Sequence, residues 1–130
     1  MASIRKEFVV STSPAKVWDA VRDFGAVHRR LAPGFVVDAR LDGNARHVTF
    51  GNGSTARELL VDIDDVALRL VYSVTDGPFK HDNASVQIVA EGSGSRFIWQ
   101  RDMLPDELKP AIDAAMDQAS AVMKATLESA

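Results

Sequence analysis

The feature that most constrains the fold is a series of six strand-like segments, separated by short turns, that leads into one long amphipathic helix. The segments cover residues 35–41, 46–50, 55–63, 67–74, 84–90 and 96–103. The separators DGN, GNGS, DD, TDGPFKHDN and EGSGS are rich in turn-forming residues. Connections this short favour antiparallel neighbours. We therefore expect an antiparallel sheet.

The C-terminal segment predicts a single long helix that follows Pro105. Its apolar residues recur at helical spacing: Ile112, Ala115, Met116, Ala119, Val122, Met123 and Leu127. Pro110 lies early in this run and is a candidate for the true start of the regular helix. A wide apolar stripe must be buried, and the sheet is the only partner large enough, so we expect the sheet to curl around this helix.

The N-terminal part adds one more strand and two short helices. SIRKEFVV, residues 3–10, alternates between polar and apolar residues and predicts a first strand. STSP then supplies capping residues and a proline for a helix that ends at Gly25, and a second short helix covers 26–31. The predicted fold is α+β, with a seven-stranded curved antiparallel sheet around the C-terminal helix. We expect residues 1–130 to form a single domain.

Charge and composition argue against several classes of function. A formal net charge of −3 disfavours nucleic acid and anionic membranes as partners, and the basic cluster at 28–30 has no interleaved aromatic residues. The absence of cysteine excludes disulfides, and the three histidines are far apart in sequence, so we expect no metal site and no cofactor. With no signal peptide or membrane span predicted, we expect a cytoplasmic monomer or homodimer.

Residues 46–60, RHVTFGNGSTARELL, predict a β-hairpin with a three-residue Gly-Asn-Gly turn. Such a turn pairs Arg46 with Glu58 on one face and His47 with Arg57 on the other. Two basic groups opposite each other belong in water. We therefore expect the face that carries Arg46 and Glu58 to point into the interior.

Local apolarity argues against this assignment of the faces. Leu59, Val61 and Ile63 make the opposite face of the second strand the more apolar one, although a β-bulge could switch faces along the strand. An inward carboxylate at Glu58 is costly unless it is paired, and Arg46 is the available partner. The pair is open to three interpretations: a catalytic dyad, a pair that orients a ligand or supports the fold, or a partly exposed ion pair at the rim.

Several motifs, taken in order, resemble a known family. They are SPAKVWDAVRDF (13–24), RHVTF (46–50), ARELLVDID (56–64), LRLVYSV (68–74) and SRFIWQRDMLP (95–105). Their order and spacing resemble the polyketide cyclase/dehydrase family of the START-related, birch-pollen-allergen-like helix-grip superfamily. The resemblance covers nearly the whole chain. It implies a ligand cavity between the sheet and the last helix, with Glu58 directed into it.

In such a cavity we expect apolar walls and a few orienting polar groups. The candidate ligand-binding residues are Arg46, Val48, Phe50, Glu58, Leu60, Tyr72, Val74, Val86, Gln100, Met116, Ala119 and Met123. The candidate residues at the cavity mouth are His28, Leu31, Phe79 and His81. Plain core packing is the alternative for Tyr72 and for the methionines. Strand 96–103 is ambiguous, because either Trp99 or Gln100 could be on the inward face.

Three classes of function follow from this interpretation. The first is a module that binds one small hydrophobic or amphipathic molecule. The second is an enzyme of the cyclase/dehydrase kind with Glu58 or Tyr72 as acid or base, although no motif establishes catalysis. The third is a non-catalytic protein-interaction module.

Overall fold

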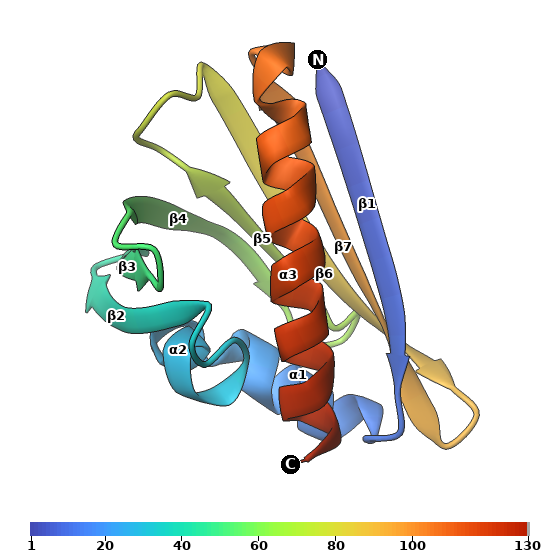
Figure 1. Cartoon of the computed structure of the whole chain (residues 1–130). Helices are drawn as coiled ribbons and strands as arrows, with labels where there is room; N and C mark the ends of the chain where they lie inside the picture. Colours follow the sequence, from blue (N-terminus) through green and yellow to red (C-terminus); the bar gives the residue numbers. More distant parts are fainter. Residues whose placement is uncertain (130) are drawn as a thin grey trace.

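The computed structural model describes residues 1–129 and contains a seven-stranded antiparallel sheet that curls around a long C-terminal helix (Figure 1). The sheet order is β1-β7-β6-β5-β4-β3-β2. The predicted architecture is therefore confirmed. The strands are β1 (Ala2–Val10), β2 (Val36–Asp42), β3 (Ala45–Phe50), β4 (Thr55–Asp64), β5 (Arg69–Val74), β6 (His81–Glu91) and β7 (Gly94–Leu104).

The long helix α3 (Lys109–Glu128) crosses the concave face of the sheet (Figure 1). Its buried residues are Met116, Ala119, Met123 and Leu127, which belong to the predicted apolar stripe. Pro105 precedes a short 3₁₀ turn, η2 (Asp106–Leu108), and Pro110 lies in the first turn of α3. Proline is tolerated there because its missing N–H would have no partner within the helix.

Two short helices connect β1 to β2. The first, α1 (Pro14–Arg22), buries Val17, Trp18, Ala20 and Val21. It ends three residues before the predicted end at Gly25, because the chain tightens into a 3₁₀ turn, η1 (Phe24–Ala26). The second, α2 (Val27–Arg30), falls within the predicted 26–31. Both helices lie at the end of the molecule where α3 terminates (Figure 1).

The β3–β4 hairpin has the predicted register. Arg46 pairs with Glu58 and His47 pairs with Arg57. The register shifts between Leu60 and Asp62, which is the bulge considered from the sequence. The bulge leaves Val61 55% exposed, and Ile63 packs against the core. Because of this bulge, β4 carries apolar residues on both faces while Glu58 points inward.

The β6–β7 pair is longer than predicted. β6 begins at His81 rather than at residue 84, and it pairs with β7 as far as Leu104. The polar run HDN suggested a turn, but Asp82 is 2% exposed and occupies an inward position of the strand. On β7 the buried face carries Phe97, Trp99 and Met103, which settles the ambiguity of that strand.

Candidate functional site

A cavity of about 560 Å³ lies between the concave face of the sheet and the N-terminal half of α3. We call it the sheet–helix cavity. Small side chains on both walls, Ala56 on β4 and Ala115 on α3, leave this space open. Its lining residues are Gly34, Phe35, Phe50, Gly51, Asn52, Ser54, Thr55, Ala56, Glu58, Tyr72, Val74, Pro78, Phe79, Trp99, Arg101, Ile112, Ala115, Met116 and Gln118.

A buried ion pair forms one part of the cavity wall. The Arg46 Nε donates to Glu58 Oε1 at 2.7 Å, and the two residues are 7% and 8% exposed. The Arg46 guanidinium also donates to the Phe24 carbonyl oxygen at 3.1 Å, and it stacks 3.8 Å from the centre of the Phe24 ring. These contacts fix the pair to η1. The second carboxylate oxygen of Glu58, Oε2, accepts no hydrogen bond from residues 1–129, and Glu58 is one of the residues that line the cavity.

Tyr72 presents a neutral hydroxyl next to this pair. Its oxygen accepts a hydrogen bond from the Trp99 indole N–H at 3.1 Å, and its own proton has no acceptor among residues 1–129. Burial, together with the negative charge of Glu58, raises the pKa of Tyr72 to about 12. At ordinary pH the side chain is therefore a hydrogen-bond donor to the cavity and not a base.

A second ion pair joins the buried Asp82 of β6 to the half-buried Arg101 of β7, which lines the cavity. The Arg101 Nε and Nη2 lie 3.0 and 2.9 Å from Asp82 Oδ1, and the Val74 backbone N–H donates to Asp82 Oδ2 at 3.1 Å. The Arg101 guanidinium lies 5.3 Å from the centre of the Phe79 ring. The Asp82 carboxylate thereby connects β5, β6 and β7 beside the cavity.

The Arg101–Asp82 pair was not among the residues predicted from the sequence. A signal for it was present, because Asp82 is in phase with Ala84 and Val86 on the inward face of β6. Arg101 is likewise in phase with the buried Trp99 on β7. Extending both alternating patterns by one step would have placed the two charges inside.

The structure places six of the predicted site residues on the cavity wall: Phe50, Glu58, Tyr72, Val74, Met116 and Phe79. Arg46 contacts the cavity through Glu58. A further four are buried in the core and are not among the lining residues: Val48, Val86, Ala119 and Met123.

The remaining predicted site residues lie elsewhere. Gln100 is exposed on the outer face, because the inward face of β7 carries Trp99 and Arg101, so its assignment to the cavity is wrong. His81 is the exposed first residue of β6, because the strand turns Asp82 inward. His28 and Leu31 also do not line the cavity.

The positions of His28 and Leu31 follow from the packing of α2. Leu31 is 6% exposed and belongs to the hydrophobic core. His28 is half-buried on α2, and its Nδ1 is buried without a hydrogen-bond partner among residues 1–129. Because α2 packs against β2, neither residue reaches the cavity mouth.

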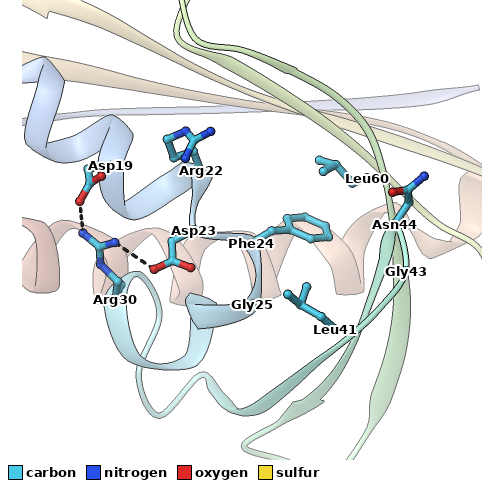
Figure 2. Close-up of a pocket in the computed structure, with 10 residues that line it drawn as sticks. All are labelled: Asp19, Arg22, Asp23, Phe24, Gly25, Arg30, Leu41, Gly43, Asn44 and Leu60. Atoms are coloured by element: carbon cyan, nitrogen blue, oxygen red, sulfur yellow. Dashed lines mark hydrogen bonds and ion pairs between the residues drawn. The ribbon is translucent and has the colours of Figure 1, made fainter.

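Leu60 lines a second and smaller pocket of about 370 Å³ between α1, η1 and the β2–β3 turn (Figure 2). The Phe24 ring points between Leu60 and Leu41, and the Asp19–Arg30–Asp23 cluster lies at the other side of the pocket (Figure 2). Phe24, stacked on Arg46, therefore lies between this pocket and the Glu58 side of the sheet–helix cavity.

Two features are absent from residues 1–129. No group of three or more His, Cys, Asp or Glu side chains is arranged to hold a metal ion in this part of the chain. No helix within the same residues combines the length and the apolar character needed to cross a bilayer.

Solved structures share this fold. A protein from Thermobifida fusca is 27% identical, with a TM-score of 0.80, and the match covers 98% of this chain and 91% of that one. Ara h 8.0201 is 18% identical, with a TM-score of 0.76, over 99% of both chains. A START superfamily protein from Mycobacterium smegmatis is 14% identical, with a TM-score of 0.76, over 98% of this chain and 94% of that one. None of the curated proteins compared matches the sequence.

The likeness to Ara h 8.0201 and the START superfamily protein identifies the fold as the helix-grip fold expected from the sequence motifs. The family model described as "Polyketide cyclase / dehydrase and lipid transport" matches residues 1–129. The chain belongs to this polyketide cyclase/dehydrase and lipid transport family.

Proposed function

We propose that this protein reversibly binds one hydrophobic or amphipathic small molecule in the sheet–helix cavity. The observation that carries the proposal is the cavity itself. Its volume of about 560 Å³ lies within the range of small-molecule sites, roughly 300–1,000 Å³. Family membership and the helix-grip fold support the same role.

The composition of the wall supports an amphipathic ligand. Aromatic and aliphatic side chains, among them Phe35, Phe50, Phe79 and Ile112, offer apolar contact area. Met116 adds an unbranched, adaptable side chain from α3. The buried polar side chains of the wall are Glu58 and Tyr72, whereas the other polar lining residues, Asn52, Ser54, Thr55, Arg101 and Gln118, are half-buried or exposed. This arrangement suits a site in which apolar contacts supply affinity and a few polar contacts fix orientation.

The same geometry favours binding over acid–base catalysis. A general acid or base works best with a pKa near the working pH. Burial raises the pKa of Tyr72 to about 12, far from that range. Glu58 is held by Arg46 at 2.7 Å, an arrangement suited to a fixed hydrogen-bond acceptor.

A cavity-blocking variant tests the proposal. Ala115 lines the cavity from α3, and Ala115→Trp should fill much of the space. Ala121, exposed on the same helix, provides the matched control Ala121→Trp. The probe is the uncharged dye N-phenyl-1-naphthylamine, whose fluorescence rises in apolar surroundings.

We expect saturable dye binding to the unchanged protein and to the Ala121 variant, and at least tenfold weaker binding to the Ala115 variant. Circular dichroism would verify that both variants fold. Equal dye binding by the two variants would contradict the proposal, as would a folded protein that takes up no dye.

A further inference from the structure

We propose that the sheet–helix cavity selects uncharged ligands that carry a hydroxyl group, with Glu58 and Tyr72 as the residues that determine this specificity. The inference rests on the proposed ligand-binding function and names the chemical class of the ligand. It follows from the charge balance of the cavity wall and from the hydrogen-bonding capacity that the protein leaves unused there.

The charges in and directly behind the cavity wall cancel. Arg46 is paired with Glu58, and Arg101 is paired with Asp82. The wall therefore offers an incoming anion no unpaired cation among residues 1–129. An anionic ligand would also lose its hydration on entering the cavity, and it would meet the open oxygen of Glu58.

Arg101 is a poor anchor for a ligand carboxylate. Its Nε and Nη2 both point to Oδ1 of Asp82, whose side chain is fully buried. Drawing the guanidinium toward a ligand would weaken this contact and would leave a buried carboxylate undercompensated. The existing pair thus competes with any anion that enters the cavity.

Among the buried residues of the wall, two hydrogen-bonding positions have no partner within residues 1–129. Oε2 of Glu58 needs a donor, and the Tyr72 hydroxyl, whose oxygen already accepts from Trp99, needs an acceptor for its proton. A hydroxyl group is both donor and acceptor. An ether or ketone offers only an acceptor, and an ammonium group offers only donors.

The register brings these two positions together. Glu58 pairs with Val74, and Leu60 pairs with Tyr72, so Glu58 and Tyr72 are diagonal neighbours on the inward face of β4 and β5. Diagonal neighbours lie about 7–8 Å apart, within reach of long side chains. The negative charge of Glu58 also acts on Tyr72, which indicates the same proximity. One ligand hydroxyl between them can donate to Glu58 and accept from Tyr72.

The test uses three biphenyl probes that differ only at the para position: 4-hydroxybiphenyl, 4-methoxybiphenyl and biphenyl-4-carboxylate. Dissociation constants are measured for the full chain near pH 7 by displacement of N-phenyl-1-naphthylamine and by calorimetry. We expect the hydroxyl probe to bind at least tenfold more tightly than the methoxy probe and the carboxylate probe.

Two variants assign the selectivity to its residues. In Glu58→Gln, Arg46 loses its counter-charge, so the preference for the hydroxyl probe over the carboxylate should fall below about threefold. Tyr72→Phe should weaken the hydroxyl and methoxy probes by about three- to tenfold, because both use the tyrosine proton. Glu107→Gln, the same chemical change at an exposed residue of η2, should leave all three dissociation constants unchanged.

The outcomes separate the two proposals. Equal binding of the three probes, or tighter binding of the carboxylate, would overturn hydroxyl selectivity and leave cavity binding intact. Failure of every probe and of the dye to bind the folded protein would overturn both proposals. The comparison of the three probes on the unchanged chain tests hydroxyl selectivity even if a variant does not fold.

Discussion

Removal of Arg46 should cost far more stability than removal of an exposed arginine in an ion pair of equal length. Arg46→Met deletes the guanidinium that lies 2.7 Å from Glu58 and leaves a carboxylate that is about nine-tenths buried without a counter-charge. Breaking a buried pair in this way costs about 3–5 kcal/mol. The variant also loses the stacking on Phe24, which contributes about 1 kcal/mol.

The matched control is Arg96→Met. Arg96 lies 2.7 Å from Glu91, but both side chains are more than one-third exposed, so water can solvate the remaining charge. Urea denaturation followed by circular dichroism gives the free energy of unfolding of each variant. For a chain of this length we expect the Arg46 variant to lose about 12–20 °C in melting temperature.

The double variant Arg46→Met/Glu58→Leu completes a thermodynamic cycle. Replacing both charges by apolar groups of similar size leaves no unpaired charge, so most of the lost stability should return. An Arg46 variant that is no less stable than the Arg96 variant would refute the reasoning, because it would mean that Glu58 is solvated from the cavity at little cost.

Three further predictions concern other parts of the structure. Tyr72 is the only tyrosine, so near-ultraviolet absorbance should give a tyrosinate midpoint near pH 12 in the folded state. Because this pKa is raised above its value in the unfolded chain, its stabilising contribution is complete below about pH 10, and roughly 3 kcal/mol is lost as the pH rises through 12. Gly94→Ala should lower the melting temperature much more than Ser93→Ala, since a Cβ at Gly94 would lie 2.2 Å from the Val10 carbonyl oxygen. Gln100→Ala should leave the dissociation constant of N-phenyl-1-naphthylamine unchanged, because Gln100 lies on the outer face.

Alternation and turn chemistry were sufficient to predict the sheet, its seven strands and the register of the β3–β4 hairpin. The face of Glu58 was correct because the pairing of His47 with Arg57 requires one face to be solvated. The sequence could not locate the bulge after Leu60, since a bulge changes the phase of side chains without changing their composition.

The cavity residues were harder to predict than the fold. Alternation separates inward from outward side chains, but it does not say which inward residues border a void and which pack against one another. Met116 lines the cavity, whereas Ala119 and Met123, one and two turns further along the same stripe, are buried in the core. That distinction depends on how α3 packs across the curved sheet, which is a tertiary property.

The two ion pairs indicate why a largely apolar cavity wall also carries charged side chains. Apolar replacements of similar volume would stabilise the fold at least as well as a buried pair does. They could not, however, present the fixed, desolvated acceptor that Glu58 provides on the cavity wall. Arg46 holds that carboxylate in place and is itself held by the Phe24 carbonyl oxygen of η1. The turn η1 therefore contacts the Arg46–Glu58 pair of the proposed ligand site through Phe24, although none of the residues of η1 lines the cavity.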